Sequence, residues 1–184
     1  TPFRISLFGG GSDYPEWYSK FGGAILGFAI DKYCYISVRP LPPFFEHKHR
    51  IVYSQVENVR KISEIQHPSV RAVLTDQNTQ VGLEIHHDGD LPARSGLGSS
   101  SSFTVGLIHA IKAMNGQLTG CKKLAQEAIR IEHLVIKECV GIQDQIWSAF
   151  GGFNQIKIIQ DGEFDVQPII LNSDRRNELF NSLM

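Results

Sequence analysis

The stretch Asp90-Leu91-Pro92-Ala93-Arg94-Ser95-Gly96-Leu97-Gly98-Ser99-Ser100-Ser101-Ser102 is a glycine- and serine-rich loop that leads directly into the segment 103–114. That segment is apolar on nearly every side, which is typical of a helix buried in a core. A glycine-rich turn before a helix N-terminus offers converging backbone N–H groups, room for close approach and positive potential. The stretch is therefore a candidate phosphate-binding site.

A flexible loop with an ordinary serine helix cap would have the same composition. We favour the phosphate site because a flexible linker would not run straight into an apolar helix. The stretch is not a P-loop, since the lysine of G-x-x-x-x-G-K-[ST] is absent, and it does not fit the dinucleotide pattern G-x-G-x-x-G.

Three segments together resemble one known superfamily. Pro92–Ser101 resembles the phosphate-binding motif P-x-x-x-G-L-G-S-S-A of the GHMP kinases, which include galactokinase, homoserine kinase, mevalonate kinase and phosphomevalonate kinase. Pro2–Tyr14 resembles their N-terminal substrate motif, and Gly141–Gln145 resembles the segment that carries their catalytic aspartate. The glycine-rich motif of their C-terminal domain is absent. The resemblance implies that residues 1–184 are the N-terminal, ATP-binding domain of a protein about twice as long.

Hydrophobic periodicity predicts a mixture of strands and helices. We expect strands at 2–8, 30–39, 51–54 and 81–87, and helices at 13–20, 68–74, 98–114, 122–138 and 144–150. A hairpin is expected over 153–170, with Asp161-Gly162 at its turn. Because the elements do not alternate strictly, the pattern favours an α+β fold. The resemblance implies a ribosomal protein S5 domain 2-like fold, in which helices cover mainly one face of a mixed or antiparallel sheet.

The overall composition is that of an ordinary globular protein. Of the 184 residues, 42% are hydrophobic and 20% are charged, and the net charge is −1. This balance provides no basic surface for nucleic acid or an anionic membrane. The three cysteines, Cys34, Cys121 and Cys139, favour reduced thiols in a cytoplasmic protein over a disulfide framework. No apolar run reaches the roughly 20 residues that span a bilayer, and no signal peptide is visible.

Glu132 is a carboxylate inside an apolar stripe of the expected helix 122–138. The other members of that stripe are Ala125, Ala128, Ile129, Val135, Ile136 and Cys139. A buried carboxylate must be paired or bind a metal, unless it reaches water at the edge of the stripe. Glu132 precedes Asp144 by the spacing seen in galactokinase-like relatives, where the glutamate holds Mg²⁺. The resemblance therefore implies Glu132 and Ser100 as Mg²⁺ ligands, with Ser99 as the alternate to Ser100.

Asp144 follows a glycine turn and begins a short helix, where the helix dipole favours a carboxylate whatever its role. The resemblance implies that Asp144 is the base that accepts the proton of the substrate hydroxyl, with Arg4 as an adjacent cation. Phosphoryl transfer needs mainly positioning and charge neutralisation, so ATP and Mg²⁺ are the implied cofactors. The residues expected to bind ATP phosphates are Pro92, Arg94, Ser95, Gly96, Leu97, Gly98, Ser99, Ser100 and Ser101.

The N-terminal motif, Pro2–Tyr14, indicates which substrate to expect. Galactokinases carry G-E-H-T-D-Y where this chain has Gly9-Gly10-Gly11-Ser12-Asp13-Tyr14. This triple-glycine motif, together with G-x-Q-D-Q and F-G-G-F-N in 141–154, most resembles the motifs of the D-glycero-D-manno-heptose 7-phosphate kinases. The fucokinases are the next most similar group. We expect phosphorylation of the C1 hydroxyl of that heptose phosphate. The substrate-binding candidates are Gly10, Gly11, Ser12, Asp13 and Tyr14, and those for a distal phosphate are Lys20, Lys32 and Arg94.

Two alternatives stay open. The chain is either another sugar kinase, acting on fucose, galactose or a non-sugar alcohol, or a catalytically silent sensor of sugar and ATP. A sensor need not keep Arg4, Glu132 and Asp144. The only expected partner is the small-molecule substrate, and the oligomeric state is left open. We interpret Glu46–His49 and His86–Asp88 as solvated surface rather than metal sites. Three aromatic residues could line the substrate or base pocket: Trp17, Tyr18 and Tyr33. For at least two of them we favour packing in the core.

Overall fold

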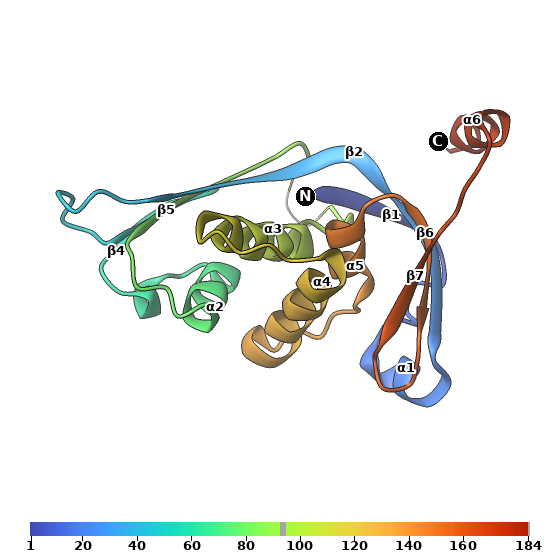
Figure 1. Ribbon diagram of the computed structural model, residues 1–184, viewed down its shortest axis with the longest axis horizontal. Helices are drawn as coiled ribbons and strands as arrows, with labels where there is room; N and C mark the ends of the chain where they lie inside the picture. Colours follow the sequence, from blue (N-terminus) through green and yellow to red (C-terminus); the bar gives the residue numbers. More distant parts are fainter. Residues whose placement is uncertain (93–94, 184) are drawn as a thin grey trace. The chain divides into compact units, whose positions relative to one another are not determined.

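The computed structural model describes residues 1–92 and 95–183, which form two compact units. One unit comprises Thr1–Ile5 and Ala29–Gly151, and the other comprises Ser6–Phe28 and the chain from Gly152 onward. The strands β1 (Pro2–Phe8) and β2 (Gly23–Pro40) each contribute residues to both units. Figure 1 labels these elements along the chain.

The larger unit contains a mixed sheet in the strand order β4-β3-β5-β2. Its further strands are β3 (His49–Val52), β4 (Val56–Val59) and β5 (Leu83–Gly89). β3 pairs antiparallel with β4 and parallel with β5, whereas β5 pairs antiparallel with the C-terminal part of β2. In that last pair Cys34 lies opposite Gly89 and Pro40 opposite Leu83.

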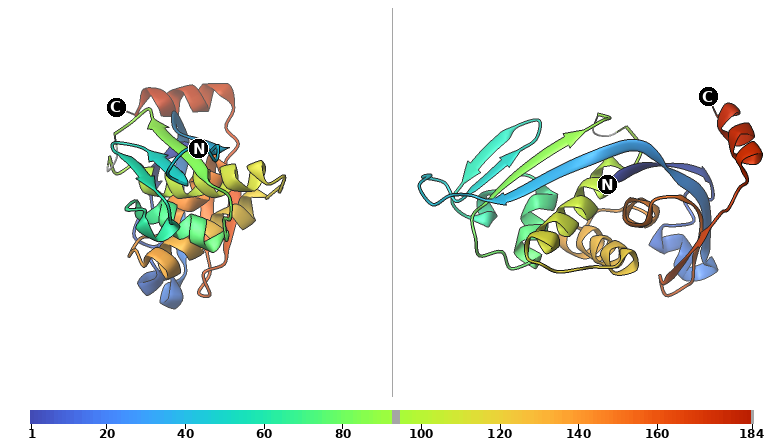
Figure 2. Two further views of the ribbon diagram at one scale, coloured as in Figure 1. Left: turned by 90° about the vertical axis from the view of Figure 1, so that its left-hand side faces the viewer. Right: turned by 45° about the horizontal axis from the view of Figure 1, so that its top comes forward.

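Helices of the same unit cover one face of this sheet, as Figures 1 and 2 show for α2 and α3. The helical elements are η1 (Ile62–Glu64), α2 (Pro68–Asp76), α3 (Ser99–Met114), α4 (Cys121–Arg130), η2 (Ile131–Ile136) and α5 (Gln143–Phe150). The core lies between them and the strands, with fully buried Ile85 on β5 and Leu107 and Ile108 on α3. The expectation of an apolar helix after the glycine-serine loop is confirmed.

The expected helix 122–138 is not one regular α-helix. α4 ends at Arg130, and η2 continues it as a π-helical turn that carries Glu132. A π-helix bonds residue i to i+5, so it changes the helical phase of the residues that follow. The predicted apolar stripe is therefore wrong beyond Glu132, because Val135 and Cys139 are exposed. π-helical turns are frequent at functional sites.

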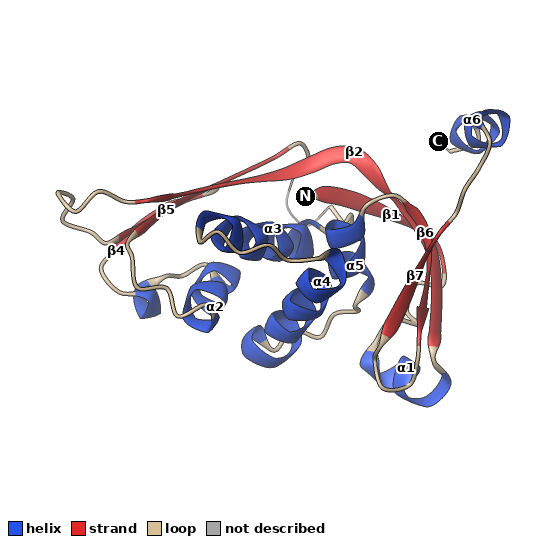
Figure 3. Cartoon of the chain, viewed as in Figure 1, coloured by secondary structure: helices blue, strands red, loops and turns tan. Residues whose placement is uncertain are grey.

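The smaller unit contains residues 23–28 of β2, which pair antiparallel with β6 (Phe153–Ile158), and the β6-β7 hairpin. Its other elements are α1 (Pro15–Phe21), β7 (Phe164–Pro168) and α6 (Ser173–Asn181). The hairpin turns at Asp161-Gly162 as expected, with Gly162 at φ +86°. Figure 3 separates these strands and helices by colour. The mixture of elements confirms the α+β prediction.

Several local expectations are wrong. β2 begins at Gly23 rather than near 30, and β4 was not expected. Trp17 is 52% exposed and Tyr33 is 37% exposed, so neither packs in the core. His49 is only 1% exposed and is not solvated surface. Within residues 1–92 and 95–183, no cluster of three or more His, Cys, Asp or Glu side chains is arranged for a metal. None of the helices in these ranges is long and apolar enough to cross a membrane.

Candidate functional site

The glycine-serine loop enters α3 through two glycines with left-handed backbone conformations. Gly96 has φ +76°, and Gly98, the N-cap of α3, has φ +81°. A Cβ added to Gly98 would lie 3.3 Å from Cγ and Oδ2 of Asp144 and 3.4 Å from Cγ of Arg4. The missing side chain at Gly98 thus lets the loop backbone approach both charged side chains closely.

Arg4 holds this loop from β1. Its backbone N–H donates to the carbonyl of Leu97 at 3.1 Å, and its Nη1 donates to the carbonyl of Gly96 at 3.0 Å. Both bonds take up loop carbonyl groups. Neither bond uses an N–H group at the start of α3, which is the positive end of the helix dipole.

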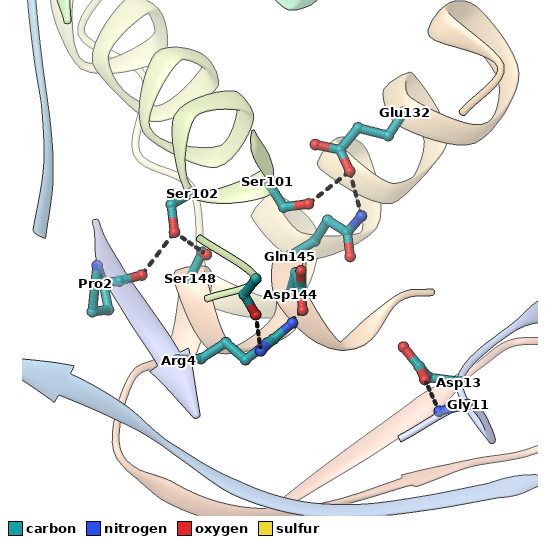
Figure 4. A network of polar contacts seen from close by, with 11 residues as sticks. Pro2, Arg4, Gly11, Asp13, Ser101, Ser102, Glu132, Asp144, Gln145 and Ser148 are labelled. Atoms are coloured by element: carbon teal, nitrogen blue, oxygen red, sulfur yellow. Dashed lines mark hydrogen bonds and ion pairs between the residues drawn. The ribbon is translucent and has the colours of Figure 1, made fainter. Parts of the chain in front are cut away.

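Arg4 also pairs with Asp144, which lies in the first turn of α5. Nε of Arg4 donates to Oδ1 of Asp144 at 2.6 Å, across 140 positions of sequence (Figure 4). The two side chains are 14% and 25% exposed. The pair is therefore partly shielded from water yet open to a ligand. The expected proximity of Arg4, Asp144 and the loop is present, whereas their catalytic roles stay predictions.

Glu132 is buried, at 1% exposure, next to the start of α3. Its Oε2 accepts hydrogen bonds from Oγ of Ser101, at 2.9 Å, and from Nε2 of Gln145 (Figure 4). Burial raises the pKa of Glu132 above its ordinary value, and hydrogen bonds from Thr104, Ser101 and Gln145 act in the opposite direction. The carboxylate does not point to bulk solvent, which was the main alternative to a metal role.

The other oxygen of this carboxylate and the amide oxygen of Gln145 are both buried without a hydrogen-bond partner among the described residues. They are Oε1 of Glu132 and Oε1 of Gln145. A buried acceptor without a donor is unfavourable, and a cation bound at either oxygen would offset that cost. A carboxylate, an amide oxygen and a hydroxyl are hard oxygen ligands of the kind Mg²⁺ prefers, with phosphate oxygens completing its coordination. The residues present fit the implied Mg²⁺ ion.

The serine that contacts Glu132 is Ser101 rather than the expected Ser100. Ser101 is 4% exposed, whereas Ser100 faces solvent and Ser99 is half-buried. The assignment of Ser100 as a ligand stays a prediction, and Ser101 now competes with it. Ser102 has a structural position: its Oγ donates to the Pro2 carbonyl at 2.8 Å and bonds Oγ of Ser148 at 2.9 Å, which ties α3 to β1 and α5.

The remaining loop candidates are only partly described. Pro92, Ser95 and Gly96 are exposed and Leu97 is half-buried. Arg94 lies outside the described residues, so its expected phosphate contact is not placed. Lys20 and Lys32, the other candidates for a distal phosphate, are both exposed.

The substrate-motif residues belong to the smaller unit, where they form a closed turn. Asp13 is fully buried, and its Oδ1 accepts the N–H of Gly11 at 3.0 Å (Figure 4). Oγ of Ser12 donates to the Gly9 carbonyl at 2.7 Å and accepts the N–H of Ala24 at 3.2 Å. Tyr14 is 38% exposed, and Gly10 and Gly11 are exposed. The substrate roles of Gly10 to Tyr14 stay predictions.

Sequence reasoning missed Ser101 and Gln145 as partners of Glu132. A signal for Gln145 was present, because it lies beside the apolar pair Ile146 and Trp147, and all three are fully buried. A buried glutamine requires a partner, but the sequence does not identify that partner.

Comparisons with known proteins agree with this geometry. Residues 62–152 match the family model "GHMP kinases N terminal domain". A D-glycero-alpha-D-manno-heptose 7-phosphate kinase of Campylobacter jejuni is 27% identical over 188 residues, covering 97% of this chain and 56% of that protein. A galactokinase of Thermotoga petrophila is 27% identical over 158 residues, covering 82% and 43% respectively.

A solved structure is also similar. The crystal structure of a D-glycero-D-manno-heptose 1-phosphate kinase from Bacteriodes thetaiotaomicron has a TM-score of 0.84 and 26% identity to this chain. The match covers 97% of this chain and 61% of that one. The chain spans about half the length of the curated relatives it matches. The geometry of the site and these matches lead to one conclusion: residues 62–152 of this chain are a GHMP kinase N-terminal domain.

Proposed function

We propose that residues 1–184 are the N-terminal, ATP-binding domain of a kinase that phosphorylates a sugar phosphate, with D-glycero-D-manno-heptose 7-phosphate as substrate and its C1 hydroxyl as acceptor. The observation that carries the proposal is the contact of Arg4 with Asp144 directly against Gly98, at the N-terminus of α3. It brings a carboxylate base, a cation and a phosphate-binding backbone into one place.

Each group has a role in the transfer. Asp144 accepts the proton of the sugar hydroxyl as its oxygen bonds to the γ-phosphorus and the bond to the ADP oxygen breaks. Arg4 stabilises the negative charge of Asp144 and the charge that develops on the transferred group. The N–H groups at the start of α3 bind phosphate oxygens.

The buried Glu132 and a neighbouring serine, Ser101 or Ser100, would hold Mg²⁺. When bound, the ion supplies charge neutralisation to the phosphate oxygens. Gln145 donates to Glu132 and so keeps its carboxylate oriented.

The test is turnover of the full-length protein with ATP and a panel of acceptors. The panel contains heptose 7-phosphate, heptose 1-phosphate, fucose, galactose and mannose, because the heptose kinase relatives are described with different phosphates. We expect the highest kcat/KM with heptose 7-phosphate. Preference for an unphosphorylated sugar would replace the substrate assignment and leave the kinase assignment intact.

Asp144→Asn tests the mechanism. The amide keeps the shape but cannot accept the hydroxyl proton, so kcat should fall about 10²-fold or more while ATP affinity changes little. Asp174→Asn, at an exposed position of α6, is the matched control and should leave kcat unchanged. An unaltered kcat in Asp144→Asn would mean that the carboxylate is structural.

The silent sensor is the second candidate. It predicts ATP and sugar binding without turnover against every acceptor, which the same panel detects. The Arg4–Asp144 contact and the two unpartnered oxygens beside Ser101 favour the enzyme, because a sensor needs neither a base nor a metal ligand.

A further inference from the structure

A polar cavity lies in the larger unit, away from the glycine-serine loop. Its volume is about 390 Å³, and it is bordered by the start of β3, the end of β4 with η1, and the end of α2 with the turn that follows. β5 begins at Leu83, beside His49 of β3, and ends at Gly89 just before the loop. Seven extended residues span roughly 20 Å, so the cavity lies at the opposite end of the sheet from the loop.

Cations dominate the rim of this cavity. Lys48, Arg60 and Lys61 line it, and no Asp or Glu is among its lining residues. Nε of Arg60 donates to the Glu46 carbonyl at 3.2 Å. Arg60 and Lys61 also attract the Glu64 carboxylate, so part of their charge is balanced outside the cavity lining. The carboxylate of Glu64, nearby in sequence, accepts the backbone N–H groups of Arg60 and Lys61 and does not line the cavity. The cavity therefore has positive potential.

A buried histidine adds a fixed donor. His49 lines the cavity yet is only 1% exposed, and its Nδ1 accepts the backbone N–H of Leu83 at 3.4 Å. An Nδ1 that accepts this bond carries no proton, so the ring proton lies on Nε2. Among the described residues no hydrogen bond from that N–H is found, and because His49 lines the cavity, a ligand there can accept it. Burial and then Lys48 lower the pKa of His49, which agrees with a neutral ring.

The rest of the lining suits a small body with hydroxyl groups. Two apolar side chains, Ile62 and Leu74, form part of the wall. The other lining residues are Ser63, Thr75, Asn78, Thr79 and Gln80. Hydroxyl and amide groups both donate and accept, so they match the hydroxyls of a polyol. The volume falls within the range of small-molecule sites.

We propose that this cavity binds a small phosphorylated sugar or polyol, with the phosphate held by Lys48, Arg60, Lys61 and the Nε2–H of His49. Three cations and a neutral donor match the dianion of a phosphate monoester better than a single carboxylate. The site is separate from the proposed catalytic site, so its occupation does not depend on the proposed kinase activity.

The test measures binding rather than turnover. Histidine ring signals of the full-length protein are followed by NMR during titration with inorganic phosphate, glycerol 3-phosphate and ribose 5-phosphate, against sodium chloride of equal ionic strength. We expect a saturating shift of the His49 signal with the phosphate esters, a weaker one with inorganic phosphate, and none with sodium chloride.

Variants of exposed residues keep the test independent of folding. Arg60→Gln with Lys61→Gln should weaken binding of the esters at least tenfold, because two charge-assisted hydrogen bonds are lost. Lys123→Gln, at an exposed position of α4 outside the cavity, is the matched control and should bind as the parent does. The proposal is overturned if chloride shifts the His49 signal as phosphate does, or if the double variant binds normally. It is equally overturned if a short oligonucleotide displaces the esters with higher affinity than theirs, which would indicate a polyanion surface.

Discussion

Replacing Gly98 by alanine tests whether the close approach of the loop to the Arg4–Asp144 pair matters for catalysis. The change adds one methyl group at a residue with φ +81°, where that methyl would lie 3.3 Å from the Asp144 carboxylate and 3.4 Å from Cγ of Arg4. Gly116→Ala is the matched control. Gly116 has φ +70°, and nothing lies within 4 Å of its added Cβ.

The structure separates the two contributions. Both variants place a Cβ in left-handed backbone, which costs about 1–2 kcal/mol of unfolding free energy. For a chain of this size that corresponds to a fall in Tm of roughly 2–8 °C. Only Gly98→Ala must also displace Asp144 and Arg4 by a few tenths of an ångström. Because a misplacement of about 1 Å is worth on the order of 10²-fold in rate, we expect kcat to fall about tenfold or more.

Thermal unfolding followed by circular dichroism gives the stability of each variant, and steady-state phosphorylation by the full-length protein gives kcat. The expected result is a similar loss of Tm in both variants with a loss of kcat in Gly98→Ala alone. The reasoning is refuted if Gly98→Ala keeps the kcat of Gly116→Ala, because the loop would then tolerate a side chain against the pair.

Two further predictions concern the serines and the histidines. Ser101→Ala should remove a hydrogen bond to the buried Glu132 carboxylate and lower the unfolding free energy by about 1.5–3 kcal/mol. It should also raise the Mg²⁺ concentration that gives the half-maximal rate about tenfold. Ser100→Ala should change the unfolding free energy by less than about 0.5 kcal/mol. A larger Mg²⁺ effect in Ser100→Ala would restore the sequence-based ligand and reject Ser101. Burial and then His87 lower the pKa of His67, so its stabilising contribution is present above pH 6.5 and is lost as the pH falls through the folded-state pKa. Denaturant titrations at pH values between 6.5 and the folded-state pKa of His67 should show the unfolding free energy falling by up to about 1.4 kcal/mol per pH unit for this group. The variant His67→Phe keeps a ring against Phe103 and should reduce that slope. An unchanged slope in this variant would contradict the assignment.

The sequence by itself predicted the glycine-serine loop and the buried helix after it, and it marked Glu132 as a carboxylate that needs a partner. These predictions follow from local rules, whereas the roles of Arg4 and Asp144 came from the resemblance to the GHMP kinases and stay predictions. Glycine and serine before an apolar run specify a turn and a helix start, and a carboxylate in an apolar stripe requires a partner. It also determined the α+β class, because the order of the expected elements excludes strict alternation.

Only the tertiary structure decided which partners meet. Ser100 and Ser101 are adjacent residues of the same type, so the sequence does not distinguish them. The rotation of α3 from its N-cap at Gly98 decides that Ser101 faces Glu132. The π-helical turn η2 changes the phase after Glu132, and no residue in the sequence marks that turn. The burial of His49 likewise depends on the pairing of β3 with β5, and it turns a residue expected on the surface into the fixed donor of a cavity. Contacts across 140 positions, such as Arg4 with Asp144, arise from packing of the whole unit, which local periodicity does not encode.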